Sequence, residues 1–164
     1  MKRSLFGAAI LVCVVAVATI GSASGAARSS PAPSVTRSAA KVELTNTKLG
    51  KVLADGSGRT LYLFEKDKGS KSACFGACAT AWPPLTTTGK PTALKGVSAS
   101  KLGTIDRGNG VRQVTYNGHP LYRFVKDTGP RQTHGEGLKA FGAEWYALSA
   151  AGKKVDEAGS QAAT

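Results

Sequence analysis

The chain has 164 residues and a formal net charge of +12 at pH 7. This length suits about one domain of ordinary size, and the charge favours contact with anionic surfaces such as envelope polymers, phospholipid headgroups or nucleic acid. The lysines are scattered rather than packed into one run, so a solubilising surface is the simpler interpretation, and no motif specific for nucleic acid is present.

The first 26 residues have the pattern of a secretory signal peptide. The basic Met1-Lys2-Arg3 precedes an apolar run from Phe6 to Gly21, and small residues follow it. The run is shorter than the roughly 20 residues that a membrane-spanning helix needs. We therefore expect cleavage near Gly25 to Ala27, export to an extracellular, periplasmic or cell-envelope location, and no transmembrane span in the mature chain.

Cys13 does not complete a lipidation signal. A lipobox places its cysteine directly after small residues, whereas Cys13 follows the large Val12 in the middle of the apolar run. A lipid anchor is therefore not expected, and Cys13 would leave with the signal peptide.

The remaining chain divides into a folded part and two loose ends. Residues 27–40 are rich in Ser, Ala and Pro, which is typical of a flexible tether, and residues 156–164 have the composition of a loose tail. We expect the folded domain over residues 41–155. Alternating apolar residues and intervening glycine turns predict its strands, at residues 42–47, 51–55, 59–65, 102–107, 111–117 and 143–149.

Turn and breaker residues refine this prediction. Asn117-Gly118 is a strong hairpin signal, since both residues tolerate a positive φ. Residues 143–149 and 153–155 suggest a further hairpin. The segment 72–82 could form one or two helical turns that Pro83-Pro84 would end. The expected fold is mostly β, with antiparallel sheets and a short helical or loop segment around a pair of cysteines.

An internal repeat organises the domain. Residues 61–67 read LYLFEKD and residues 121–127 read LYRFVKD, so five of seven letters are identical. Each heptapeptide follows a strand and a glycine turn, and each precedes a tryptophan, Trp82 or Trp145. This pattern predicts two related β-hairpin units, at about residues 41–100 and 101–155.

The heptapeptide has the alternation of a strand with one aromatic face. Tyr62 and Phe64 point to the same side, as do Tyr122 and Phe124, so we expect these rings to pack in a shared core. On the opposite face, the leucine of the first copy is replaced by Arg123, which predicts a partly wet surface there.

Asp67 and Asp127 follow the two strands. A carboxylate at such a place can accept hydrogen bonds from nearby backbone N–H groups and hold the turn. The alternative is a pair of acids for acid–base catalysis or for a metal ion. A pattern that occurs once in each structural unit favours the structural role.

These residues resemble a known family. YLFEKD (62–67) and YRFVKD (122–127) match the Yx(FWY)xxD motif of bacterial secreted-repeat proteins, many of which are described as lipoproteins. CFGACATAWPPL (74–85) and VTYNGHPLYRF (114–124) are also similar to that family. The resemblance extends over nearly all of residues 41–155. It implies an exported protein of unknown biochemical role and no particular reaction.

Cys74 and Cys78 are the sharpest chemical feature. Exported proteins usually meet an oxidising compartment, so a local disulfide is the default expectation, with a stabilising effect of roughly 2 kcal/mol. The spacing is not that of a thioredoxin-like pair, and no histidine follows as in c-type haem attachment. A redox-active pair, or ligation of a metal ion or haem, remains the alternative.

His119 and His134 are weak candidates for a metal site. Together with Cys74 and Cys78 they could supply thiolate and imidazole ligands for copper or zinc. Nothing in their spacing requires this, and each histidine lies in a segment with the composition of a turn or polar loop. Two exposed turn residues are the simpler interpretation.

No catalytic motif is present: the chain has no GxSxG, no HExxH and no phosphate-binding glycine loop. We therefore predict a non-enzymatic binding or scaffold module of the cell envelope or extracellular space, without a cofactor. Its expected partners are anionic envelope polymers or another envelope protein. One alternative is a redox, metal- or haem-handling protein that uses Cys74 and Cys78, and another is a basic polyanion-binding module.

Overall fold

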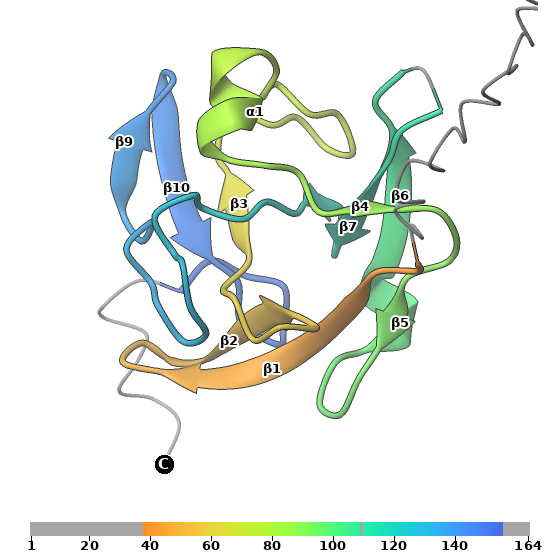
Figure 1. Cartoon of the computed structure of the whole chain (residues 1–164), viewed down its shortest axis with the longest axis vertical. Coiled ribbons are helices and arrows are strands. Elements are labelled where there is room, and N and C mark those ends of the chain that lie inside the picture. Colours follow the sequence, from red (N-terminus) through yellow and green to blue (C-terminus); the bar gives the residue numbers. More distant parts are fainter. Residues whose placement is uncertain (1–37, 109, 156–164) are drawn as a thin grey trace, which may run out of the picture. The chain divides into compact units, whose positions relative to one another are not determined.

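The computed structural model describes residues 38–108 and 110–155, which form mostly β structure (Figure 1). The predicted signal peptide, most of the predicted tether and the predicted tail lie outside these residues. The elements are β1 (Lys41–Thr47), β2 (Gly50–Asp55), β3 (Tyr62–Phe64), α1 (Ala77–Ala81), β4 (Thr86–Thr87), β5 (Thr92–Ala93), a 3₁₀ turn (Ala99–Lys101), β6 (Leu102–Asp106), β7 (Arg112–Tyr116), β8 (His119–Pro120), β9 (Leu138–Ala140) and β10 (Ala143–Ala147).

Within the described residues the strands form three small sheets. Their orders are β2-β1-β5, β3-β10-β9 and β4-β7-β6, with β8 paired to β7. Each of these strand pairs is antiparallel except β1 with β5, which run parallel. The prediction of a mostly β fold with antiparallel sheets is therefore confirmed.

Two of the hairpin turns place a residue other than glycine at a positive φ. Asn117 and Gly118 join β7 to β8 with φ values of 50° and 84°, as the sequence predicted. Phe141 and Gly142 join β9 to β10 with φ values of 57° and 93°. The sequence did not predict this second hairpin, because an aromatic residue with a positive φ is uncommon.

The strand predicted at residues 143–149 has two partners beyond the one expected, because β10 pairs with β3 and with β9. The predicted hairpin with residues 153–155 is present but short: the Leu148–Lys154 bridge is accompanied by hydrogen bonds from the Ser149 N–H to Lys153 and from the Val155 N–H to Ala147. Figure 1 shows β10 between β3 and β9. A strand of the second repeat thus completes a sheet that contains the central strand of the first.

The two repeats exchange segments reciprocally. β10 of the second repeat pairs with β3 of the first, and β4 of the first repeat pairs with β7 of the second. Two sets of backbone hydrogen bonds repeat the same donor pattern. In the first set the N–H of Leu53 donates to the carbonyl of Leu148, that of Leu61 to Leu53, and that of Leu148 to Leu61. In the second set Val114 takes the place of Leu53, Leu85 that of Leu148, and Leu121 that of Leu61. The repeats are therefore interlocked about a local pseudo-twofold axis.

The first tyrosines of the two heptapeptides meet at this axis. The backbone N–H of Tyr62 donates to the carbonyl of Tyr122 at 2.9 Å, and the N–H of Tyr122 donates to the carbonyl of Tyr62 at 3.0 Å. This is an antiparallel bridge between equivalent residues. The repeated motif consequently pairs with its own copy.

The two heptapeptides separate two buried clusters, as their alternation predicted, although only the first contains a strand, β3, and the second has isolated bridges at Tyr122. The aromatic side chains of Tyr62, Phe64, Tyr122 and Phe124 lie in one cluster with both tryptophans. Leucines of the opposite faces lie in a second, mostly aliphatic cluster: Leu61, Leu63 and Leu121. Each heptapeptide therefore contributes side chains to both clusters.

Four rings form a continuous stack through the first cluster. Phe64 stacks on Trp145 with centroids 4.1 Å apart, Trp145 on Trp82 at 3.9 Å, and Trp82 on Phe124 at 4.2 Å. Each phenylalanine thus stacks on the tryptophan of the other repeat. Stacked aromatic pairs contribute about 0.5–1.5 kcal/mol beyond their buried area, so the stack couples the two repeats energetically.

The residues around the cysteines form the helical turns that the sequence predicted. α1 has the sequence ACATA, and its last turn ends at Trp82, whose N–H donates to the carbonyl of Cys78. Pro83 and Pro84 follow and cannot continue the helical hydrogen bonding. The helix therefore delivers Trp82 directly into the ring stack.

Trp82→Ala is expected to destabilise the whole described domain by about 3–5 kcal/mol, because it removes the centre of the stack. Val125→Ala is the control, since Val125 is 50% exposed and the loss of its side chain should change stability by about 0.5 kcal/mol or less. Urea unfolding followed by far-UV circular dichroism measures both. A variant that unfolds in two separate transitions would contradict the interlocked arrangement.

Candidate functional site

The tyrosine and aspartate of each motif form hydrogen bonds with the other repeat. The hydroxyl of Tyr62 donates to Oδ2 of Asp127 at 2.5 Å, and the hydroxyl of Tyr122 donates to Oδ2 of Asp67 at 2.8 Å. The sequence places a tyrosine and an aspartate in each motif, but it did not reveal that each tyrosine binds the aspartate of the opposite motif across the axis. The most prominent polar groups of the motif are thus used between the repeats.

The second oxygen of each carboxylate accepts a backbone N–H, as the sequence analysis predicted. Oδ1 of Asp67 accepts from Ala73 at 2.7 Å, and Oδ1 of Asp127 accepts from His134 at 3.0 Å. Each aspartate therefore closes the loop that follows its own motif while it binds the tyrosine of the other repeat.

Burial keeps the tyrosines protonated. Burial and the adjacent Asp127 carboxylate raise the pKa of Tyr62 well above its usual value. Burial also raises the pKa of Tyr122, and the charge of Asp67 adds to this effect. Burial raises the pKa of the Asp67 carboxyl too, although hydrogen bonds from Ala73 and Tyr122 oppose the change. Both hydroxyls therefore remain donors over the usual pH range.

The two halves of this arrangement differ at one loop. Nδ1 of His134 lies 3.0 Å from Oδ1 of Asp127, and the His134 side chain is 59% exposed. In the first repeat, Ala73 takes the corresponding place. The next residue, Gly135, packs so closely that a Cβ atom would lie 2.8 Å from the Trp82 ring and 2.9 Å from the Tyr62 ring. The loop of the second repeat is thus tightly fitted over the core.

An arginine of the second repeat joins the cysteine loop of the first. Nη1 of Arg107 donates to Oγ of Ser72 at 2.7 Å, and Nη2 donates to the carbonyl of Cys74. Oγ of Ser72 also lies 2.7 Å from the hydroxyl of Tyr122, so the arginine reaches the Tyr122–Asp67 pair through one serine. The guanidinium stacks on the ring of Phe75 with a separation of 4.4 Å.

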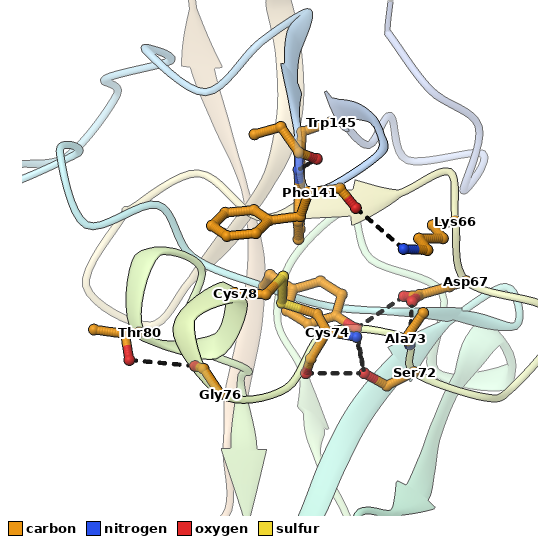
Figure 2. Close-up of a disulfide and its surroundings, with 12 residues drawn as sticks. Lys66, Asp67, Ser72, Ala73, Cys74, Gly76, Cys78, Thr80, Phe141 and Trp145 are labelled. Atoms are coloured by element: carbon orange, nitrogen blue, oxygen red, sulfur yellow. Dashed lines mark hydrogen bonds between the residues drawn. A yellow bond between two sulfur atoms is a disulfide. The ribbon is translucent and has the colours of Figure 1, made fainter.

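Cys74 and Cys78 form a disulfide beside α1, as predicted (Figure 2). Their Cα atoms are 5.2 Å apart, and the exposed fractions of the two residues are 0% and 6%. Figure 2 also shows the β9–β10 turn near the disulfide, where the carbonyl of Phe141 accepts a hydrogen bond from Nζ of Lys66 at 3.2 Å. The disulfide is therefore enclosed by the protein.

An ion-pair cluster with a buried carboxylate and two partly exposed arginines lies on the other face of the heptapeptides. The side chain of Asp55 is 3% exposed, and its Oδ2 accepts from Nε of Arg123 at 2.6 Å and from Nη2 of Arg59 at 3.1 Å. Burial opposes ionisation of Asp55, but hydrogen bonds from the Ser57 N–H and from Arg123 outweigh it and lower the pKa of the carboxyl. The change from Leu63 to Arg123 was the sequence signal for this pair, although the partner was not predictable.

Two segments of the chain, residues 43–86 and 103–149, match a family described as a secreted repeat of unknown function. Together they make up more than half of the chain. The chain belongs to this family. A comparison with curated proteins gives no match, and a comparison with solved structures gives none either.

The family assignment supports the resemblance drawn from the sequence. The two matched segments of this secreted repeat correspond to the two interlocked halves of the fold, and the family's description indicates export. It names no reaction. Within residues 38–108 and 110–155, no helix has the length and apolar character needed to cross a membrane.

The weak candidates for a metal site, Cys74, Cys78, His119 and His134, do not come together. In the part of the secreted repeat that the structure describes, no three histidine, cysteine or acidic side chains are arranged to hold a metal ion. Both sulfur atoms are engaged in the disulfide. His119 instead lines a cleft of about 580 Å³ that also contains Asp67 and an ion pair between Glu65 and Lys154, with Nζ and Oε1 2.8 Å apart.

The exchanged hydrogen bonds predict a particular pattern of energetic coupling. A double-mutant cycle of Tyr62→Phe with Asp127→Asn should show a coupling of about 0.5–3 kcal/mol, because the two side chains are in direct contact. The same is expected for Tyr122→Phe with Asp67→Asn. The within-motif cycle of Tyr62→Phe with Asp67→Asn is the control and should be additive to within about 0.5 kcal/mol. Chemical denaturation gives all three values, and stronger coupling within a motif would contradict the exchange.

The opposite pKa shifts of Asp55 and Asp67 predict opposite effects on the pH dependence of stability. Below about pH 4, unfolded Asp55 binds more protons than folded Asp55, so its contribution to stability is present above this range and is lost as the pH falls. Above about pH 4, folded Asp67 retains its proton longer than unfolded Asp67, so its contribution decreases as the pH rises.

Asp55→Asn should therefore flatten the rise in the free energy of unfolding with pH in the acidic range, and Asp67→Asn should steepen it. Urea unfolding at a series of pH values measures both slopes. Two variants with the same change of slope would show that one of the shifts has the wrong sign.

Proposed function

We propose that this secreted repeat is an exported, non-enzymatic binding or scaffold module, and that its duplicated heptapeptide serves the scaffold. The observation that supports this most strongly is the use of the motif tyrosines and aspartates in reciprocal hydrogen bonds between the repeats. The hydroxyl and carboxylate oxygens of the motif are thus engaged within the fold, and of the two aspartates only Asp67 also lines the cleft that contains His119.

The engagement of both carboxylates argues against acid–base catalysis by the motif. Each oxygen of Asp67 and Asp127 accepts at least one hydrogen bond from the protein. A catalytic acid or base must lie within hydrogen-bond reach of the proton that it transfers to or from a substrate. Asp127 is also buried, with 3% of its surface exposed.

The redox alternative receives less support than the structural disulfide. Thiol–disulfide exchange requires access of an attacking thiolate to a sulfur atom, whereas Cys74 and Cys78 are buried. The carbonyl of Cys74 is further held by Arg107. We therefore assign the bond a stapling role for the loop that leads into α1.

The family and the N-terminal sequence support the proposed location. The family's description indicates export, and residues 1–26 have the pattern of a signal peptide, followed by a tether at residues 27–40. We propose a location in the cell envelope or outside the cell, without a lipid anchor at Cys13. An anionic envelope polymer is the favoured partner, since the chain carries 22 basic and 10 acidic residues, and another envelope protein is the second candidate.

Asp67→Asn and Asp127→Asn test the scaffold role. Each change replaces a carboxylate oxygen that accepts a hydrogen bond by an amide NH₂, so one buried donor loses its partner at a cost of about 1–3 kcal/mol. Asp106→Asn is the matched control, because Asp106 is exposed at the end of β6 and the hydrogen bond that its Oδ1 accepts from the Gly108 N–H can equally be accepted by an amide oxygen. It should change stability by about 0.5 kcal/mol or less. Thermal unfolding measures all three.

Retention on isolated cell envelopes, measured well below the unfolding temperature, completes this test. The folded aspartate variants should be retained as strongly as the unchanged protein. Full stability together with lost retention would mean that the motif is a binding or catalytic site rather than scaffold.

A further inference from the structure

Two adjoining hollows lie on the side of the heptapeptides away from the aromatic stack. Their volumes are about 290 Å³ and about 260 Å³. They share three lining residues, namely Ser38, Thr86 and Arg123. Lys41, Asp55 and Ser57 line the first hollow, and Arg112 lines the second. Residues of both repeats thus form one continuous cleft, which we name the Arg123 cleft.

The pseudo-twofold axis provides an internal comparison for this cleft. Val42 pairs with Asp55 in the β1–β2 hairpin, and Leu102 pairs with Tyr116 in the β6–β7 hairpin, so Asp55 and Tyr116 hold corresponding places. Leu63 and Arg123 correspond in the same way as the third residues of the two heptapeptides.

In the other half of the fold, a leucine and a tyrosine occupy the positions that correspond to Arg123 and Asp55. Leu63 and Tyr116 both lie in the aliphatic cluster. The hydroxyl of Tyr116 donates to the carbonyl of Ala150 at 2.8 Å and accepts from the N–H of Ser98 at 3.2 Å. The fold is therefore satisfied there by a leucine and a tyrosine. The stability of the fold thus does not by itself require Asp55 and Arg123 at the equivalent positions beside the Arg123 cleft.

Asp55 orients Arg123 without using all of its donors. Among the described residues, the one side-chain hydrogen bond of Arg123 runs from Nε to Asp55 at 2.6 Å. The side chain is 29% exposed, and its two terminal nitrogens remain available as donors in the cleft. An arginine held in one orientation loses less conformational entropy when it binds a planar or tetrahedral oxyanion.

The other lining residues extend this donor set. Lys41 and Arg112 are exposed and positively charged. Among the described lining residues the single carboxylate is that of Asp55, which is occupied by Arg59, Arg123 and two backbone N–H groups. Hydroxyl groups that can both donate and accept hydrogen bonds surround them, from Ser38, Ser57 and Thr86. The cleft is thus a positively charged, hydroxyl-lined depression.

We propose that the Arg123 cleft binds an oxyanion, either a phosphodiester or a carboxylate, that is carried on a polyhydroxylated envelope polymer. This inference rests on the proposed binding function and names its ligand class and site. Guanidinium groups match oxyanions through paired, charge-assisted hydrogen bonds, and the hydroxyl side chains suit the neighbouring hydroxyls of a polyol or sugar. The large exposed apolar residues of the described chain lie elsewhere, at Phe75, Val125, Leu138 and Phe141, so the cleft lacks side chains that would insert into a bilayer.

The test compares two double variants that remove the same charge. Lys41→Gln with Arg112→Gln removes two positive charges from the cleft, and Lys48→Gln with Lys51→Gln removes two from the other end of the β1–β2 hairpin, where both lysines are exposed. Titration calorimetry with poly(glycerol phosphate), polygalacturonate and neutral dextran measures binding by the full exported chain at low ionic strength. We expect the cleft variant to bind an anionic polymer about tenfold more weakly, the control to change by less than about twofold, and dextran not to bind.

Arg123→Lys provides a second variant that keeps the charge beside Asp55 but removes the forked donors. It should weaken polymer binding several-fold while the unfolding temperature stays close to that of the unchanged protein. Preference for poly(glycerol phosphate) over polygalacturonate would assign the phosphodiester, and the reverse preference would assign the carboxylate.

Three results would overturn the proposal. If both double variants weakened polymer binding equally, the attraction would be a diffuse effect of charge. The protein would then still bind the polymer, but not through the Arg123 cleft. Binding to phosphatidylglycerol vesicles but to neither polymer would assign a membrane surface instead. Failure to bind either polymer would show that oxyanion-bearing polymers are not the ligand. The scaffold role would still be tested separately by Asp67→Asn and Asp127→Asn.

Discussion

The antiparallel bridge between Tyr62 and Tyr122 is the constraint on which the rest of the fold depends. It sets two copies of the same heptapeptide side by side about a local axis, so each tyrosine hydroxyl reaches the aspartate of the opposite motif. The same placement aligns the phenylalanines with the tryptophans of the opposite repeat. Neither half can complete its core or its polar network alone, which explains why the motif occurs twice in one chain.

Much of this arrangement was predictable from local patterns, and the remainder depended on long-range contacts. Period-two alternation predicted the aromatic faces, Asn117-Gly118 predicted a hairpin, and the spacing of Cys74 and Cys78 in an exported chain predicted a disulfide. The exchange of Tyr62 with Asp127 was not predictable, because 65 residues separate them and either aspartate satisfied the same local rule. The β9–β10 turn was missed since Phe141 adopts a positive φ that its residue type seldom does.

The differences between the repeats carry more information on function than their similarities. Where the copies agree, their side chains are engaged in the core and in the hydrogen bonds across the axis. Where they differ, at Leu63 and Arg123, one half is filled and the other carries a buried carboxylate paired with a partly exposed arginine beside a positively charged cleft. Under the proposed binding function, a duplicated scaffold that specialises one of two equivalent places would give a symmetric fold a single binding site.

Native-state hydrogen exchange at the amides of Tyr62 and Tyr122 tests the central claim most directly. Each amide donates to the carbonyl of the other residue, so neither can open without separating the two repeats. Both amides are therefore expected to exchange with the same free energy, equal to that of global unfolding, and with the same dependence on denaturant. Exchange of one of them through a smaller, local opening of its own repeat would contradict the interlocked fold.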